Sequence, residues 1–389
     1  MDGYLPIGDR VRELRRRRGL SQLRFGALID RSENWGSKAE RGEIPIDRLS
    51  VLVRIAEALK VSPGELIADP RVSHDEAESP MRAGIAGVRR AVLVPPSPQR
   101  VRSLEELDAA LIDANQVWNR VAITATLGLL PGLLGELDAA AREGNESAVR
   151  LLGQGYGFVS AVMTRLAEHD LAWVAVERSR MLAERLSDPA AIAHAGFRLV
   201  HVVLGAGRLE EAAQVADAAL ARADGDMGSA RVRSLVGAIY LPLAVTAARR
   251  SDEATAFSAL DEASRLADEV PQDVRFWTGF KPTNVQLHHV AVAVDLGNAG
   301  EALRVAETID LSKVRADRRS RHLIDVAMAH SYRRDTASMI ETLREVEGFA
   351  PEQLQNFPLV RELVWQALRK ERGRPNADLH RIALRIGVA

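Results

Sequence analysis

Two short stretches with helical periodicity, separated by a tight turn, occupy residues 18–42. Ser21 precedes the first stretch and Ser32 precedes the second, and a serine in that place accepts a hydrogen bond from an unpaired amide of the first helical turn. Asp30 lies in the turn between them, and Gly42 follows the second stretch, where glycine commonly ends a helix. The spacing therefore predicts a helix-turn-helix unit.

Apolar residues at helical spacing extend this unit on both sides. Val11 and Leu14 predict an earlier helix that ends at Gly19, and residues 49–59 predict a fourth helix. Ser62-Pro63 predicts a short fifth helix, because proline is tolerated in the first turn. We expect an all-α head of five helices at residues 5–69. The inward residues of the second helix are expected to be Phe25, Leu28 and Ile29.

Residues 5–69 resemble the xenobiotic-response-element (lambda-repressor-like) helix-turn-helix family. The residues that carry this resemblance are Leu14-Arg15, Arg18-Gly19-Leu20-Ser21-Gln22, Ser32, Glu40-Arg41-Gly42 and Leu59-x-Val61-Ser62-Pro63-x-Glu65-Leu66. The resemblance implies a DNA-binding head whose third helix lies in the major groove. It places Gln22 at a phosphate clamp, and Glu33, Asn34 and Lys38 at base-reading positions. It implies that Ser32, Ser37 and Arg41 complete the DNA-binding set, the last two as phosphate contacts.

Hydrogen-bonding chemistry assigns a base to each reading position. Asn34 suits adenine, Lys38 suits guanine or a phosphate, and Glu33 can accept from N4 of cytosine. Gly36 departs from the family pattern, which has an apolar anchor there, and we expect Trp35 to fill the space.

The overall charge limits how the chain can attract a partner. With 52 Lys+Arg and 53 Asp+Glu the formal net charge is −1, so nucleic-acid contact must come from a local patch. The arginines of residues 10–18 could form such a patch or simply solvate one helix face. The absence of cysteine excludes thiolate catalysis, cysteine-containing zinc sites and disulfides. Hydrophobic content of 47% with 4% aromatics indicates a core of Ala, Leu and Val.

No membrane or export segment is expected. Residues 1–10 lack a basic stretch followed by an apolar core, so no signal peptide is predicted. The longest apolar stretch, residues 122–137, contains Gly128, Pro131, Gly132 and Gly135 and is too interrupted to span a bilayer. We therefore expect a soluble, cytoplasmic protein with no membrane partner.

The rest of the chain predicts a linker and a helical body. Residues 70–102 are polar or proline-rich, with one helix expected at residues 81–93, and should connect head and body loosely. Residues 103–389 predict about a dozen helices. The segment that begins at Gly207 recurs at Gly297, and this pattern of a turn followed by small residues resembles the tetratricopeptide repeat. An unspecialised helical bundle is the alternative; a repeat superhelix would offer a concave binding groove.

The combination of head and body resembles actinobacterial regulators, and the segment of residues 276–285 is similar to a stretch seen in that group. Aromatic residues edged by polar ones in this segment are typical of a small-ligand pocket, although ordinary helix packing is the alternative. The candidate ligand-binding residues are Asn115, Trp118, Asn119, Arg275, Trp277, Phe280, Lys281, Asn284 and His288.

Catalytic and cofactor motifs are missing from the sequence. No HExxH, GxxxxGK[ST] or GxSxG pattern occurs, and the nine histidines form no metal-binding pattern. We therefore expect neither an enzyme nor a cofactor. The leading hypothesis is a transcriptional regulator that binds a two-fold DNA operator as a homodimer and senses a small molecule or peptide. The alternative is a protein-interaction scaffold with a vestigial or auxiliary head.

Overall fold

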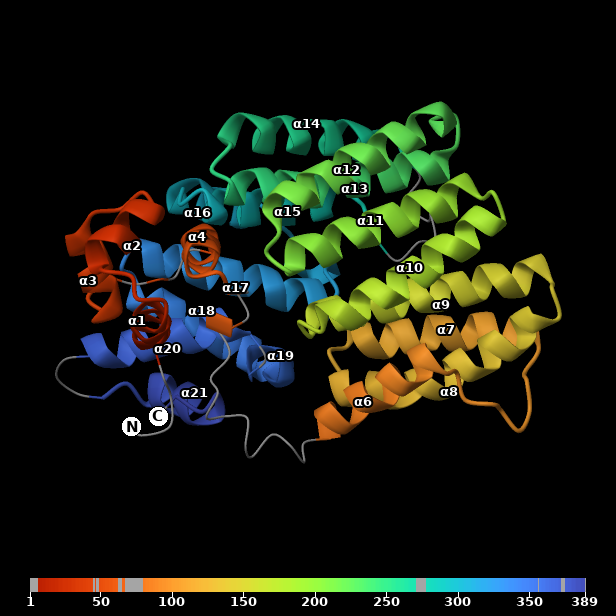
Figure 1. Ribbon diagram of the computed structural model, residues 1–389, viewed down its shortest axis with the longest axis horizontal. Helices are drawn as coiled ribbons and strands as arrows, with labels where there is room; N and C mark the ends of the chain where they lie inside the picture. Colours follow the sequence, from red (N-terminus) through yellow and green to blue (C-terminus); the bar gives the residue numbers. More distant parts are fainter. Residues whose placement is uncertain are drawn as a thin grey trace. The chain divides into compact units, whose positions relative to one another are not determined.

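The computed structural model describes residues 6–44, 46, 49–61, 65–66, 80–270, 278–355, 357–371 and 375–388. Every regular element among these residues is a helix (Figure 1), which confirms the predicted all-α class. The chain divides into two compact units. Unit 1 combines residues 1–77 with residues 290–389, and unit 2 comprises residues 78–289.

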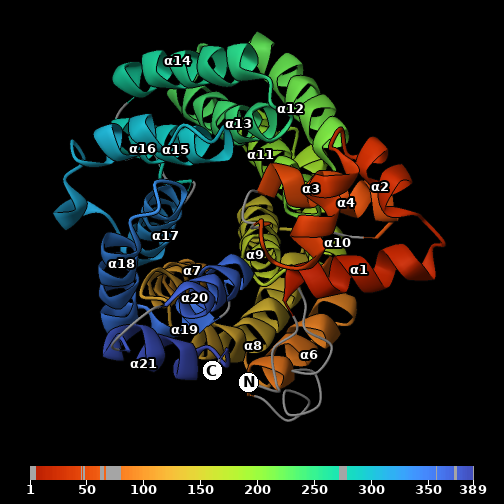
Figure 2. The same ribbon diagram turned by 90° about the vertical axis from the view of Figure 1, so that its left-hand side faces the viewer.

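Unit 2 is a succession of helices in which neighbours along the chain pack on one another, as α11 to α14 do in Figure 2. Its elements are α6 (Pro80–Leu93), α7 (Leu104–Asn119), α8 (Ile123–Arg142), α9 (Glu146–Arg165), α10 (His169–Arg185), α11 (Pro189–Gly205), α12 (Leu209–Ala223), η2 (Asp224–Asp226), α13 (Ala230–Arg249), α14 (Glu253–Glu269) and the greater part of α15 (Pro282–Asp295). Small residues such as Ala172, Ala175 and Ala216 are fully buried where these helices meet, which permits close approach.

Eight of the described turns between successive helices, in both units, share one backbone conformation. A single residue with positive φ ends the preceding helix, and the next residue is the N-cap of the following one. Glycine supplies the positive φ at Gly144 and Gly207, whereas Ser251 supplies it between α13 and α14. The residues with positive φ at these junctions are Val121, Gly144, Ala167, Ser187, Gly207, Ser251, Gly297 and Arg334. The same helix-turn-helix geometry thus recurs along the chain.

Helix α6 belongs to the core of unit 2. The predicted helix is present, and it buries Val88, Ala91 and Val92 against the neighbouring helices. A Cβ on Gly84 would stand 2.8 Å from Cβ of Leu127, so glycine is needed for α6 to approach α8 this closely. The loose linker expected over residues 70–102 therefore contains a packed core helix. The boundaries predicted at 69 and 102 stay predictions, while the compact units divide the chain at 77 and 289.

Among the described residues one helix, α13, is long and apolar enough to cross a membrane, but most of its apolar residues are buried inside unit 2. Burial of this kind is typical of the core helix of a globular unit.

In unit 1 the described part of the head contains four helices. They are α1 (Ile7–Arg17), α2 (Gln22–Leu28), α3 (Glu33–Glu40) and α4 (Leu49–Leu59). Phe25 and Ile29 are buried as predicted, but Leu28 is 54% exposed, so its predicted inward position is wrong. The reason is that α2 ends at Leu28, and its short buried face is already filled by Phe25 and Gly26. Of the predicted fifth helix, Glu65 and Leu66 are helical and Leu66 is buried, and the remainder lies outside the described residues.

The C-terminal helices complete unit 1. They are the end of α15, α16 (Ala299–Ala306), η3 (Leu311–Lys313), α17 (Ala316–Tyr332), α18 (Thr336–Phe349), α19 (Pro351–Gln355), α20 (Pro358–Lys370) and α21 (Ala377–Arg385). Helix α18 packs on α17 and α21, and α20 packs on α17, α19 and α21. Val360, Leu363 and Val364 of α20 are buried in this core.

Candidate functional site

The helix pair α2–α3 has the geometry that its sequence predicts. The Ser21 hydroxyl accepts from the amide of Arg24, and the Ser32 hydroxyl accepts from the amide of Trp35, so each serine caps its helix. A Cβ on Gly26 would stand 2.7 Å from the carbonyl oxygen of Arg31. Only glycine allows α2 to lie this close to the turn, which fixes the angle at which α3 leaves it.

A buried ion pair joins the first three helices of the head. The Arg15 guanidinium donates through Nε and Nη2 to the two oxygens of Glu40, and through Nη1 to the carbonyl oxygen of Leu20 at 2.6 Å. Both charged side chains are buried, and hydrogen bonding to Glu40 raises the pKa of Arg15. Gln22 Nε2 also donates to Glu40, at 3.2 Å. Arginine from α1, glutamine from α2 and glutamate from α3 therefore meet at one carboxylate.

This arrangement determines which part of α3 (the recognition helix) faces outward. Glu33, Asn34 and Arg41 are exposed, and Ser37 and Lys38 are half-buried. Arg41 Nη1 donates to the Ser37 hydroxyl, and Arg41 Nε donates to Glu43 at 2.6 Å. Hydrogen bonding to Glu43 raises the pKa of Arg41 and lowers that of the Glu43 carboxyl. The predicted reading residues thus form one accessible polar surface, with Arg41 at its C-terminal end.

The predicted DNA-binding residues differ in how their side chains are engaged. The Ser32 hydroxyl caps α3 and the Gln22 amide is hydrogen-bonded to Glu40, whereas Glu33 and Asn34 project into solvent. A phosphate role for Gln22 stays a prediction.

Gly36 is accommodated in a way that the sequence did not indicate. It is buried, and a Cβ placed on it would meet Cδ1 of Phe25 at 3.5 Å. Phe25 from α2 therefore fills the space expected for Trp35. Trp35 is half-buried instead, and the Arg31 guanidinium lies 5.7 Å from the centre of its ring.

The arginine run of α1 divides between core and surface. Arg10 and Arg15 are buried, while Arg16 and Arg17 are exposed near the C-terminal end of the helix. Arg24 on α2 and Arg31 in the turn are also exposed. These exposed arginines were not among the predicted DNA-binding residues. The signal that could have identified Arg16 and Arg17 is the arginine run of residues 10–18, which the sequence offers as a local positive patch.

The predicted ligand-binding residues that the structure describes lie in α7 and around the start of α15. In α7, Asn119 Nδ2 donates to Asn115 Oδ1 at 2.9 Å, and Trp118 packs against the core. Phe280 is buried over Gly237 of α13, where no Cβ would fit. Asn284 is buried and its carbonyl oxygen lies 2.8 Å from Nδ1 of His288, while Lys281 is exposed. Arg275 and Trp277 lie outside the described residues. Their roles in ligand binding stay predictions.

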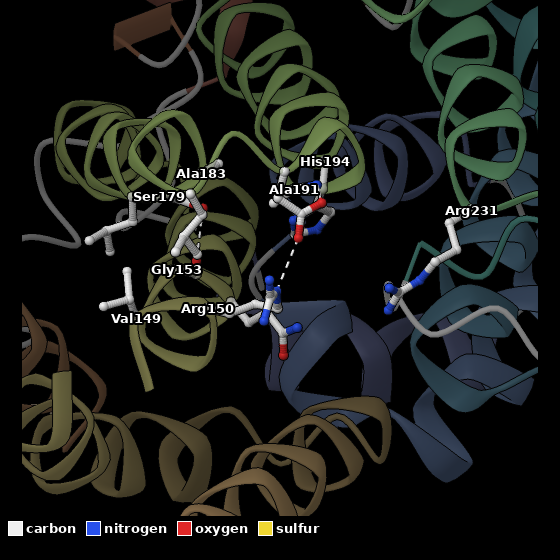
Figure 3. Close-up of a pocket in the computed structure, with 12 residues that line it drawn as sticks. Val149, Arg150, Gly153, Ser179, Ala183, Ala191, His194 and Arg231 are labelled. Atoms are coloured by element: carbon white, nitrogen blue, oxygen red, sulfur yellow. Dashed lines mark hydrogen bonds and ion pairs between the residues drawn. The ribbon is translucent and has the colours of Figure 1, made fainter. Parts of the chain in front are cut away.

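A small cavity, partly open to solvent, lies among α9, α10 and α11 of unit 2 (Figure 3). Its polar groups include Gln154, the Arg150–Asp188 ion pair at 3.0 Å and the Ser179 hydroxyl, which donates to the carbonyl of Gly153. Arg231 extends toward it from α13 (Figure 3). The apolar part of the lining is Val149, Leu182, Ala183, Leu186 and Ala191.

His194 lies on the wall of this cavity. Burial, followed by the charge of Arg198, holds its pKa well below the usual value, so the imidazole is neutral near pH 7. Its Nε2 lies 3.2 Å from Nε of Arg198, which has to donate, so His194 carries its proton on Nδ1. No group of histidine and acidic side chains among the described residues is arranged to hold a metal ion.

Comparison with known proteins identifies the head. Residues 6–69 match the family model described as a helix-turn-helix domain, which confirms that prediction for the N-terminus. The chain is also similar to the crystal structure of BtubC (BKLC) from P. vanneervenii, with 13% sequence identity and a TM-score of 0.39. That similarity covers 69% of this chain and 95% of the other. No curated protein matches the chain.

Proposed function

We propose that this chain is a sequence-specific, DNA-binding transcriptional regulator without enzymatic activity. The proposal depends on the arrangement of the recognition helix. Glu33 and Asn34 are exposed at its N-terminal end, while Glu40 on its buried side is hydrogen-bonded to Arg15. A rigid helix that presents hydrogen-bonding side chains to solvent suits direct reading of base edges in the major groove. Exposed arginines around α2 and α3 supply the local positive charge that the whole chain lacks.

The test is selection of a DNA sequence by the full chain, followed by gel-shift titration of that sequence and a scrambled duplex over a range of salt concentrations. The proposal expects tighter binding to the selected duplex at every salt concentration. Specific recognition typically exceeds non-specific binding by about 10³-fold or more. Salt-dependent binding that is equal for both duplexes would refute sequence-specific recognition.

The protein acts as a homodimer in this proposal. One helix-turn-helix head covers a half-site, and a second copy supplies the other half of a two-fold operator. Native mass spectrometry of the complex with a palindromic duplex should find two chains per duplex. A single chain on a single half-site, with the same affinity for the half-site alone, would argue against it.

The body senses a ligand in this proposal, and it is built as tetratricopeptide-like repeats. Support for repeats comes from the recurring turn geometry and from buried small residues after Gly207 and Gly297, such as Ala212 and Ala302. The cavity between α9 and α11 combines an apolar wall with the guanidinium groups of Arg150 and Arg231. That chemistry suits a small molecule or peptide bearing a carboxylate or a phosphate.

Native mass spectrometry of the purified chain tests this by detecting a retained anionic compound. Adding that compound should change the affinity for DNA, and Arg231→Met should reduce the change while leaving affinity without the compound unaltered. Arg222→Met removes the same charge from an exposed position of unit 2 outside the cavity lining and is the matched control. Equal effects of both substitutions would exclude this cavity as the binding site.

A further inference from the structure

Helix α20, near the C-terminus, presents one face to the DNA-binding head within unit 1. Glu362, Trp365, Gln366 and Arg369 are spaced by three and four residues, so they lie along one side of the helix. We name these four residues the clamp face. Figure 1 shows α20 next to α1, and the clamp face makes hydrogen bonds to both α1 and α3. Residues more than 320 positions apart in the chain are thereby joined.

At one end of the clamp face, Glu362 caps the first helix of the head. The N-cap position of α1 is Pro6, whose side chain cannot accept a hydrogen bond. The amide of Ile7 instead donates to Glu362 Oε2 at 3.3 Å. The other carboxylate oxygen accepts from Gln366 Nε2 at 2.9 Å, and Glu362 is only 3% exposed. A carboxylate at this place also complements the positive end of the α1 dipole.

At the other end, Arg369 holds the last turn of the recognition helix. Gly42 has φ of +67°, and the amides of Gly42 and Glu43 donate to the carbonyls of Ala39 and Lys38. These two bonds are the Schellman pattern of a helix end, which leaves the Arg41 carbonyl outside the helix ladder. Arg369 Nη1 donates to that carbonyl at 3.1 Å, which places a positive charge at the negative end of the α3 dipole.

Trp365 packs against Gly42 and against the guanidinium of Arg369. Its ring lies against Gly42, where an added Cβ would stand 3.1 Å from Cη2 of the indole and 2.5 Å from Nη1 of Arg369. The Arg369 guanidinium also lies 4.8 Å from the centre of the Trp365 ring, which restricts its position. Glycine at position 42 is therefore required both by the backbone conformation and by the close approach of α20.

The clamp leaves the DNA-reading surface accessible. Glu33 and Asn34 at the N-terminal end of α3 remain exposed, whereas the clamped atoms are the backbone of its C-terminal end and the start of α1. A contact made only to helix ends can set the direction of the recognition helix without competing for DNA.

We infer that α20 positions the recognition helix, so that Glu362, Trp365 and Arg369 are positioning residues for DNA binding. The inference rests on the proposed function of the head. These contacts tie the direction of α3 to the position of α20.

The first experiment measures amide hydrogen exchange in the full chain without DNA. Arg369→Gln removes the clamp bond, Arg369→Lys retains a cationic donor, and Lys370→Gln removes the same charge from the adjacent exposed residue. Exchange at Gly42 and Glu43 should rise about 2- to 10-fold in Arg369→Gln, the range expected for one hydrogen bond. It should rise less in Arg369→Lys and stay unchanged in Lys370→Gln. Unchanged exchange in Arg369→Gln would overturn the inference whatever the chain does with DNA.

The second experiment measures affinity for the selected duplex at several salt concentrations. A positioning role expects weaker binding by Arg369→Gln with the slope of log K against log salt unchanged, because no phosphate contact is lost. A direct phosphate contact would reduce the magnitude of the slope by about 0.9, and that result would overturn the positioning role. If the natural chain binds no DNA, the proposed function fails, and hydrogen exchange alone decides whether α20 holds α3.

Discussion

At the scale of single residues, Glu40 is the group on which the helices of the head converge. Its carboxylate binds Arg15 of α1 and Gln22 of α2 while it forms part of α3. Removing one partner from a buried ion pair commonly costs about 3–5 kcal/mol, because the other charge remains buried. The exposed side chains of α3 are not part of this buried ion pair. They can therefore be substituted without breaking it, which allows the DNA sequence that α3 recognises to differ.

The salt dependence of DNA affinity should distinguish side chains of the recognition helix that read bases from side chains that bind phosphates. Asn34→Ala should weaken binding to the selected duplex by about 1–3 kcal/mol, leave binding to scrambled DNA unchanged and preserve the salt slope. Arg41→Ala should weaken binding to both duplexes and reduce the slope by about 0.9. Gel-shift titrations check this, and equal losses on both duplexes for Asn34→Ala would contradict a base-reading role.

Substitution by alanine should have opposite effects on stability at two buried glycines of the head. Gly36→Ala places its methyl group at ordinary contact distance from Phe25, so it should stabilise the head by about 0.5–1 kcal/mol through higher helix propensity. Gly26→Ala brings the methyl group to 2.7 Å from the Arg31 carbonyl oxygen and should destabilise it. Urea denaturation of the full chain measures both. A loss of stability in Gly36→Ala would contradict this expectation and show that the Phe25 side chain cannot make room for the added methyl group.

A buried histidine of unit 1 predicts a loss of stability in mild acid. Burial lowers the pKa of His322 from its usual 6.5 to about 4, and the charge of Glu345 opposes this only in part. The unfolded chain binds a proton at this histidine more readily than the folded chain does. The free energy of unfolding is therefore unaffected by this histidine above pH 6.5 and decreases as the pH falls from 6.5 toward 4. The loss is about 3 kcal/mol by pH 4.

His322→Leu should therefore flatten the dependence of stability on pH between pH 7 and pH 4.5 in chemical denaturation. His330→Asn, a half-buried position on the same helix α17, is the control. Parallel pH profiles for the natural chain and His322→Leu would contradict the assignment.

At the scale of elements, the helix ends explain why the repeat pattern is weak in the sequence. The segments at Gly207 and Gly297 resemble each other because glycine occupies the same left-handed position in both. The junction between them has Ser251 in that position, and Asp252 caps the next helix by accepting from Thr255. The turns repeat the same backbone conformation, but the residue with positive φ is often not glycine. A search for glycine in the sequence therefore misses most of these turns.

The cap that α20 provides for α1 can be tested at the same scale. Glu362→Ala removes the acceptor of the Ile7 amide and of the Gln366 amide, and should destabilise the chain by about 1–3 kcal/mol. Glu362→Gln keeps an oxygen that accepts from Ile7 and should lose less. Denaturation curves compare the two variants, and hydrogen exchange at Ile7 should be faster only in the alanine variant. Equal behaviour of both variants would count against capping by Glu362.

At the scale of the whole molecule, the two ends of the chain build one unit. The head folds together with α16 to α21, whereas α6 belongs to the helices that follow it in the sequence. A boundary drawn from local composition cannot recover such an arrangement, because it depends on which distant surfaces complement each other.

The unit boundary predicts how fragments of the chain behave. A fragment of residues 78–295 contains α6 and should fold cooperatively. A fragment of residues 103–295 lacks Val88 and Val92 and should be less stable by about 3–6 kcal/mol, the value of burying two such side chains. Circular dichroism during thermal unfolding compares them. Equal melting temperatures would show that α6 is dispensable.

The local features of the head follow from contacts between residues close together in the chain. Ser21, Ser32 and Gly42 set helix limits through bonds to residues at most five positions away, so their roles were visible in the spacing. The family resemblance placed Glu33 and Asn34 at base-reading positions, and both side chains are exposed.

Other features depend on contacts between residues far apart in the chain, and local spacing does not predict them. Phe25 rather than Trp35 fills the space beside Gly36, because the packing of α2 on α3 selects it. Phe280 lies over Gly237 and does not line the cavity near His194. The bond from Arg369 to the Arg41 carbonyl joins residues that no sequence period connects, since it depends on how two surfaces far apart in the chain fit together.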